Sequence, residues 1–255
     1  MFAVGGCSSS VNVLSTGPDG SVPYDAAIEG AKIPVGSTQC SDGIDNDGDG
    51  KIDYDDPECV GPLDNDEATF ATGIPGDNVD SCKQDCFFDG NSGMGDDGCE
   101  WQLKCDPTSV DNKCPFDSSY AQSHATECST SASQSQPCLD ACQKLVPNGC
   151  DCFGCCVVPG APNPIRLAAT CTAADFGDPT KCPTCTQVTQ CANTCDHCEI
   201  CIGKPTLPAD CATDGGTPTP TCGAWLACGP GTPLAATDCP ANYGCVTGCC
   251  HPIIP

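Results

Sequence analysis

The stretch Cys150-Asp151-Cys152-Phe153-Gly154-Cys155-Cys156 places four cysteines within seven residues. It is the densest part of a chain in which 29 of 255 residues are cysteine. Such a density is typical of secreted disulfide scaffolds and unusual in cytosolic enzymes, so it indicates an oxidising compartment. If Cys7 is set aside for reasons given below, 28 cysteines remain and could close fourteen disulfides, whose connectivity the sequence does not reveal.

Large apolar side chains are too few to form a conventional core. Leu, Ile, Val and Phe together make up about 15% of the chain, a share that ordinarily indicates disorder when the charge is also high. Disulfides change this expectation, because each native bond contributes roughly 2–4 kcal/mol, mainly by constraining the unfolded chain. The sequence therefore predicts a small disulfide-rich protein of several modules, largely irregular, with short disulfide-stapled helices and little β structure.

Composition divides the chain into five segments. The first is rich in Ser, Gly, Pro and Val, the second in acidic residues, and the other three in cysteine. We expect a leader remnant and tether at 1–39, an acidic calcium-binding module at 40–70, a cysteine-rich module with short helices at 71–160, a cysteine-rich helical segment at 161–209 and a small cysteine-rich C-terminal cap at 210–255.

Short helices are expected where cysteines recur at helical spacing. In 80–86 an N-cap candidate precedes two cysteines four residues apart, and 137–145 repeats the arrangement, with proline in the first turn and Gly149 beyond the end. These two helices could be stapled to each other or to the 150–156 segment. Between them, 118–136 is polar and low in complexity, so an extended surface loop is expected there.

The cysteines of 180–204 also fit a helix. At 100° per residue, the four cysteines from Cys191 to Cys201 fall within about 120° of one another, whereas Cys182 and Cys185 point the other way. One helix stapled on two sides is expected. From 210 onward the chain reads as an irregular β or knottin-like cap, and its seven cysteines are odd in number, so at least one must pair outside it.

The charge of the chain is strongly negative. Acidic residues number 34 against nine basic ones, a net charge of −25, which makes nucleic acid and anionic lipid surfaces poor partners and cations good ones. Eleven of the acids lie between Cys40 and Glu67, where only Lys51 opposes them. This segment is expected to need a metal ion to become compact.

The spacing of these acids indicates calcium. The run Asp45-Asn46-Asp47-Gly48-Asp49-Gly50-Lys51-Ile52-Asp53 places oxygen ligands at loop positions 1, 3, 5 and 9, glycine at position 6 and the Lys51 carbonyl at position 7. Asp56 falls at position 12, where the shorter aspartate predicts modest affinity. Hard oxygen ligands in a flexible loop suit calcium better than zinc or magnesium. The alternative is a solvated acidic turn.

The segment from Cys40 to Cys59, C-S-D-G-I-D-N-D-G-D-G-K-I-D-Y-D-D-P-E-C, resembles the thrombospondin type 3 class of calcium repeats, which also occurs in cysteine-rich secreted bacterial proteins. The resemblance covers about thirty residues. It implies that carboxylates and a backbone carbonyl wrap the ion, that Asp42 and Asp56 join the ligands named above, and that cysteines tie the ends of the loop. A true EF-hand would need flanking amphipathic helices, and Ser-Asp-Gly before the loop and Asp-Pro after it argue against them.

A second acidic, glycine-rich stretch follows at 85–97. Asp89, Asn91, Asp96 and Asp97 could surround a weaker second calcium ion, although their spacing departs from the first motif and an ordinary loop is the alternative. Residues 90–93, Gly-Asn-Ser-Gly, also match the nucleophile segment of trypsin-like proteases. We reject a protease because no histidine has the required context and the alternating strands are missing.

Three histidines leave little material for general-base catalysis: His124, His197 and His251. Only the middle one lies in a pattern with zinc-like spacing, which is Cys182-x2-Cys185 followed by Cys195-Asp196-His197-Cys198-x2-Cys201. In an oxidising compartment the same cysteines pair with one another. We therefore expect disulfides, with zinc as the alternative.

The start of the chain suggests attachment to a membrane. Val4-Gly5-Gly6-Cys7-Ser8 resembles a bacterial lipobox, in which small residues precede the cysteine that receives lipid, and the alternative is a plain N-terminal cysteine. Residues 8–39 contain no cysteine and are suited to a tether. No stretch approaches the 18 or so apolar residues of a transmembrane helix.

Together these features predict an extracellular or surface-anchored, calcium-stabilised structural or binding protein of the adhesion type, without enzyme activity. The expected location is extracellular or the bacterial cell surface, with an outer-membrane lipoprotein as one form. Calcium ions are the expected partners, together with an extracellular protein or glycan, or a second copy in self-assembly. The alternatives are a subunit of an extracellular filament or coat, and a disulfide-rich secreted enzyme or inhibitor.

Overall fold

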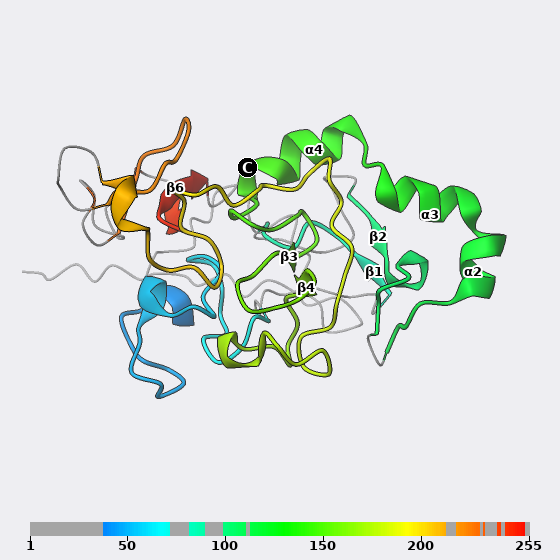
Figure 1. Cartoon of the computed structure of the whole chain (residues 1–255), viewed down its shortest axis with the longest axis horizontal. Helices are drawn as coiled ribbons and strands as arrows, with labels where there is room; N and C mark the ends of the chain where they lie inside the picture. Colours follow the sequence, from blue (N-terminus) through cyan, green and yellow to red (C-terminus); the bar gives the residue numbers. More distant parts are fainter. Residues whose placement is uncertain are drawn as a thin grey trace, which may run out of the picture. The chain divides into compact units, whose positions relative to one another are not determined.

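The computed structural model describes residues 38–71, 82–89, 99–110, 113–212, 218–229, 232, 239–240 and 243–252. They belong to one compact unit, Val35–Pro255. Figure 1 shows mostly loops, linking a few short helices and pairs of very short strands. This agrees with the irregular, disulfide-rich fold class predicted from composition.

Regular elements are short throughout the described part. The α-helices are α2 (Ser118–Ser123), α3 (Ala125–Ala132) and α4 (Gln136–Cys142). The strands form three antiparallel pairs: β1 (Lys83–Gln84) with β2 (Trp101–Gln102), β3 (Cys155–Cys156) with β4 (Ile165–Arg166), and β5 (Tyr243–Val246) with β6 (Cys249–Pro252). Single 3-10 turns are found at Gln39–Ser41, Asp53–Asp55, Leu103–Cys105, Gln143–Leu145, Ala173–Asp175 and Ala209–Cys211.

Thirteen disulfides connect these elements. They join Cys40 with Cys59, Cys82 with Cys114, Cys86 with Cys142, Cys99 with Cys138, Cys105 with Cys128, Cys150 with Cys156, Cys155 with Cys185, Cys171 with Cys182, Cys195 with Cys201, Cys198 with Cys211, Cys222 with Cys249, Cys228 with Cys245, and Cys239 with Cys250. Most of the buried apolar side chains in the described part are cysteines, so sulfur supplies much of the core that Leu, Ile and Val supply elsewhere.

Helix α4 confirms the prediction for 137–145. The Ser135 side chain accepts a hydrogen bond from the Cys138 N–H, and a proline lies in the first turn. The helix buries Cys138 and Cys142, which are bonded to Cys99 and Cys86. The segment around Cys86 is therefore stapled to helix α4, although that segment is not the helix that the prediction placed there.

The prediction of an extended loop at 118–136 is wrong, because helices α2 and α3 occupy most of it. Asp117 begins the first of them, since its side chain accepts the N–H groups of Ser119 and Tyr120 at 2.9 and 3.0 Å. The disulfide between Cys105 and Cys128 holds the second. A good N-cap and a crosslink thus outweigh the low sequence complexity.

Two predicted helices are absent. At 80–86 the described residues form strand β1 instead, because the Cys82 carbonyl accepts the Leu103 N–H and Lys83 pairs with Gln102. Residues 180–204 are all described, and they form turns and isolated bridges. The reason is that the cysteines of 180–204 bond to partners in several directions, which a single straight helix could not reach.

The 150–156 segment lies in the centre of the larger buried cluster. Asp151 is 1% exposed, and its carboxylate accepts N–H groups from Phe153 and Cys155 at 2.9 Å and from Val188 at 2.8 Å. Burial raises the pKa of Asp151, and these three hydrogen bonds act against that rise. Gly154 has φ +71°, and a Cβ there would come within 2.9 Å of the Phe87 ring, so only glycine fits this turn.

A buried ion pair adjoins this segment. Arg166 is 3% exposed, and its guanidinium lies 3.5 Å from the carboxylate of Asp106, which is fully buried. The same guanidinium also donates to the Gln84 side chain and to the Phe153 carbonyl. The single arginine of the chain therefore links strands β1 and β4 with the 150–156 segment.

The described residues of the C-terminal segment contain β structure crosslinked by disulfides. Strands β5 and β6 make a hairpin, and three of the thirteen disulfides lie within the cap. The remaining cysteine of the seven, Cys211, bonds to Cys198 outside the cap. This confirms that an odd number of cysteines must send one partner elsewhere.

Candidate metal centre

Three carboxylates of the acidic loop gather at one point. Ligand oxygens of Asp45, Asp47 and Asp49 all lie within 4.8 Å of one another. Because calcium takes oxygen ligands at 2.3–2.6 Å, two ligands on opposite sides of one ion lie about 5 Å apart. The spacing and the hard oxygen chemistry of this donor set therefore fit calcium.

The backbone of the loop holds these carboxylates in place. Asp45 accepts the Gly48 N–H at 2.7 Å, Asp47 accepts the Asp49 N–H at 2.9 Å, and Asp49 accepts the Lys51 N–H at 2.8 Å. Gly48 adopts φ +84°, in the left-handed region that glycine enters without strain. Each aspartate carboxylate accepts a backbone N–H two or three residues later in the chain. These repeated hydrogen bonds bend the loop so that the three carboxylates lie close together.

Lys51 lies at the edge of the cluster. Its Nζ atom is 3.2 Å from Asp49 Oδ2, with both side chains well exposed. The hydrogen bond from the Lys51 N–H is the main cause that holds the pKa of Asp49 below its ordinary value, and the ammonium lowers it further. Asp49 is therefore ionised at neutral pH.

Glu67 closes the loop and was missed as a site residue in the sequence. It is fully buried, and its carboxylate accepts the Asn46 N–H at 2.5 Å and the Asp53 N–H at 2.9 Å. These two donors stand at positions 2 and 9 of the loop, so one carboxylate clamps both ends. The disulfide between Cys40 and Cys59 joins the chain farther out on either side of the loop.

The other predicted ligands lie outside the three-carboxylate cluster. Asp42 accepts from the Ile44 N–H at 2.9 Å and from the side chain of Asn46. Asp53 has φ +50° and accepts the Gly43 N–H with both oxygens, at 3.0 and 3.2 Å. Their carboxylates thus stabilise the backbone that leads into the loop.

Asp56, at position 12, faces the protein interior. It is 2% exposed, its Oδ1 accepts the Glu58 N–H at 2.8 Å, and its Oδ2 is buried with no hydrogen-bond partner among the described residues. Burial, together with the nearby Glu58 carboxyl, raises the pKa of Asp56 to about 7. Glu58 in turn accepts the Ala173 N–H at 2.8 Å. Asp56 and Glu58 thus form a buried carboxyl pair, and Glu58 fastens the acidic module to the segment that contains Ala173.

A cavity of about 460 Å³ adjoins Asp56 of the carboxyl pair. It is bounded by Lys51 and Asp56 from the acidic module, Ile200 and Leu207 from the following segment, and Val246 from strand β5. The acidic module, the 200–207 segment and the C-terminal hairpin therefore meet around one space. Water can reach the neighbourhood of the pair from there.

The second predicted calcium site cannot be assembled from the described residues. Asp89 is described and is 7% exposed, which is deeper than an ordinary surface loop would place it. Asn91, Asp96 and Asp97 lie outside the described residues, as does Cys7. The second calcium site and the lipid attachment therefore stay predictions.

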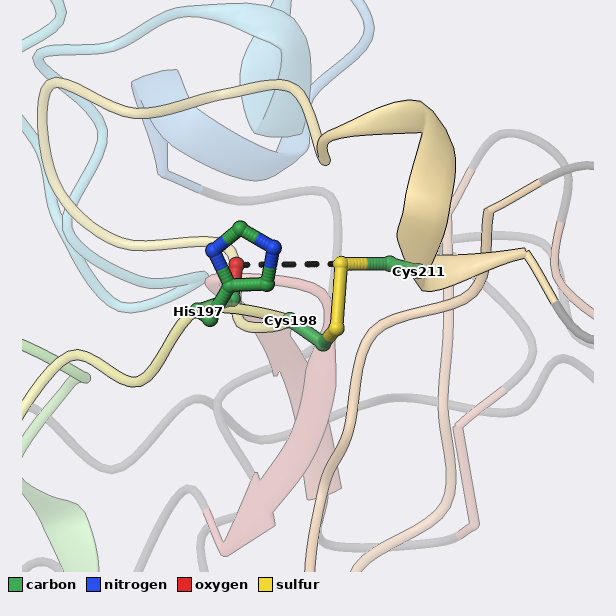
Figure 2. Close-up of side chains that lie close together, drawn as sticks. All are labelled: His197, Cys198 and Cys211. Carbon is green, nitrogen blue, oxygen red and sulfur yellow. Dashed lines mark hydrogen bonds between the residues drawn. A yellow bond between two sulfur atoms is a disulfide. The ribbon is translucent and has the colours of Figure 1, made fainter.

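The cysteines with zinc-like spacing are all bonded in disulfides, as expected. Figure 2 shows the group of His197, Cys198 and Cys211, in which the two sulfurs are bonded to each other and Cys211 Sγ lies 3.8 Å from the His197 carbonyl oxygen. Zinc binds thiolates, which a disulfide cannot supply. The imidazole lies 2.9 Å from the Asp210 carboxylate on the surface, and this contact lowers the pKa of Asp210.

The other two histidines lie in different surroundings. His124 stacks on the Tyr120 ring, with centroids 3.9 Å apart, next to the end of helix α2. His251 is buried, its Nδ1 is 3.2 Å from the Lys144 carbonyl, and burial lowers its pKa. Each is explained by local packing.

No protein-family model, curated protein or solved structure matches the chain. Among the described residues, no helix combines the length and apolar character needed to cross a membrane. The thirteen disulfides indicate an oxidising, extracellular type of environment. The interpretation of the acidic loop rests on its own geometry.

Proposed function

We propose that this chain is an extracellular, calcium-stabilised structural or binding protein of the adhesion type. The observation that carries the proposal is the convergence of Asp45, Asp47 and Asp49 within 4.8 Å. Like charges at this separation repel one another, and a divalent cation turns that repulsion into attraction. Surface attachment through acyl chains on Cys7 is part of the same proposal.

Calcium would act on the whole protein because the acidic module is anchored to its core. The Phe70 N–H donates to the Cys171 carbonyl at 3.0 Å, and the Phe70 ring stacks on Phe176 with centroids 5.5 Å apart. The Glu58 carboxylate reaches Ala173 in the same region. A loop ordered by calcium would therefore be rigidly connected to the disulfide framework, as a module that presents a binding surface requires.

Modest calcium affinity is expected. Extracellular modules bind calcium with dissociation constants of about 10⁻⁴ M, so about 1 mM free calcium would stabilise the fold by about 1.4 kcal/mol. Such an affinity suits a compartment in which calcium is always abundant. The ion would then serve as a permanent structural part and not as a signal.

Substitution Asp47→Asn is expected to weaken calcium binding by about tenfold or more, because ligand charge sets the affinity of such loops. Equilibrium dialysis at 2 mM calcium, about twenty times the expected dissociation constant, measures the bound ion in both proteins. The matched control is Asp55→Asn, which removes the same charge from an exposed side chain of the same module outside the cluster. Absence of bound calcium in the wild-type protein, or equal loss in the two variants, would contradict the proposal.

A further inference from the structure

Two buried cysteines contact each other outside the thirteen disulfides. Cys152 and Cys191 are each 0% exposed. The Cys152 N–H donates to Cys191 Sγ at 3.2 Å, and Cys152 Sγ lies 3.8 Å from the Cys191 carbonyl oxygen. Each sulfur thus touches the backbone of the other residue, although 39 positions separate them in the sequence.

Hydrogen bonds on both sides of this contact fix the distance between the two chain segments. The Gly149 N–H donates to the Asn193 carbonyl at 2.6 Å, and the Asn193 N–H donates to the Cys150 carbonyl at 2.8 Å. On the other side, the Val188 N–H donates to the Asp151 carboxylate at 2.8 Å. A disulfide needs two cysteines whose backbones lie close together, and these hydrogen bonds hold the two segments side by side at Cys152 and Cys191.

We propose that Cys152 and Cys191 form a fourteenth disulfide. The bond forms by thiol–disulfide exchange with an external low-molecular-weight or protein disulfide. The thiolate of one cysteine attacks a sulfur of that disulfide and displaces its partner as a thiolate. The second cysteine then loses its proton, attacks the mixed disulfide and displaces the other external sulfur. The two cysteines lose two electrons and two protons, and the external disulfide becomes two thiols.

The fourteenth disulfide completes a simple pairing scheme. The 28 cysteines that follow Cys7 would then all be bonded, with none left over. The bond would tie the 150–156 segment to 188–193, at the centre of the larger buried cluster. Because both sulfurs are buried, it would resist reduction once formed, as structural disulfides of secreted proteins do.

Alkylation tests the pairing on full-length protein secreted into an oxidising medium. The unreduced protein is unfolded in guanidinium with iodoacetamide, and labelled positions are located by mass spectrometry, with Cys7 scored separately. Wild-type protein is expected to carry no label at Cys152 or Cys191. Label on both residues in most molecules would overturn the proposal.

Variants provide an independent measurement. Substitution Cys191→Ser is expected to leave one labelled thiol, at Cys152, whereas the double variant Cys152→Ala and Cys191→Ala is expected to have none. If Cys191→Ser shows no label at Cys152, the two residues are not partners and the proposal fails. The wild-type measurement stands even where a variant folds poorly, because it requires no substitution.

Discussion

Replacing Asp151 with alanine is expected to lower the free energy of unfolding by about 3–6 kcal/mol. The carboxylate accepts three backbone N–H groups in a site that is 1% exposed, and alanine would leave all three without an acceptor. Each buried donor left without a partner costs about 1–3 kcal/mol, and the costs are not fully additive. Guanidinium unfolding of the unreduced protein measures the change. The buried Trp101 ring, 6.0 Å from Phe153, is a nearby fluorescent reporter.

Two further variants separate this role from a general effect of charge. Asp151→Asn keeps one oxygen for the Phe153 and Cys155 donors, but it turns an amide N–H₂ towards the Val188 N–H. We therefore expect the free energy of unfolding of Asp151→Asn to lie between that of wild type and that of Asp151→Ala. Asp175→Asn removes a partly exposed carboxylate that pairs with the exposed Lys181 at 2.8 Å, and it should cost at most about 1 kcal/mol because pairs open to solvent contribute little. If Asp151→Ala unfolds at the same midpoint as Asp175→Asn, the three hydrogen bonds do not stabilise the fold.

The sequence could predict the fold class because cysteine density and apolar content are global properties. Composition alone shows that a core of Leu, Ile and Val cannot form, and a disulfide framework is then the remaining way to order the chain. Helix α4 was also predictable, since its signals are local: a proline in the first turn and two cysteines on one face. Cysteines at both ends of the acidic loop suggested a crosslink there, and Cys40 is bonded to Cys59.

The predictions are wrong in segments where the spacing of cysteines imitates helical periodicity. In 180–204 the spacing reflects loops between crosslinks, and the partners of Cys182 and Cys185 are Cys171 and Cys155, which no local pattern could reveal. Helix α2 was missed although Asp117 before two serines is an N-cap signal, because the low complexity of the following residues was given more weight. The N-cap signal therefore predicts the structure of this segment better than its low sequence complexity does.

The residues of the candidate metal centre also fall into two groups: those that local spacing predicts and those that depend on tertiary contacts. Asp45, Asp47 and Asp49 were found from their spacing, since a short loop brings alternate residues together. Glu67 could not be found, because its role depends on a tertiary contact with the backbone at both ends of the loop. The burial of Asp56 likewise depends on packing against distant segments, and it places the position 12 carboxyl away from the cluster.

The burial of Asp56 makes the stability of the fold depend on pH. Asp56 has a pKa of about 7 in the folded protein, compared with an ordinary value of 3.8. Between these values the folded state holds more protons than the unfolded state, so stability falls as pH rises from about 4 to about 7 and is then constant. The full shift corresponds to about 4 kcal/mol, and water in the adjoining cavity reduces the expected effect to about 2 kcal/mol.

As the pH rises from 4 to 8, the free energy of unfolding of Asp56→Asn is therefore expected to increase by about 2 kcal/mol relative to that of wild type. Unfolding is measured at both pH values in calcium-depleted buffer, so that release of a bound ion does not add to the change. The control is Asp55→Asn, because Asp55 is the neighbouring aspartate of the same acidic module and is exposed. If both variants show the same pH dependence, repulsion among all the carboxylates of the acidic module, and not the buried Asp56 carboxyl, causes the change of stability with pH. A gain confined to Asp56→Asn would show that this module keeps a neutral acid in its interior at low pH, and that ionising this acid lowers the stability of the fold.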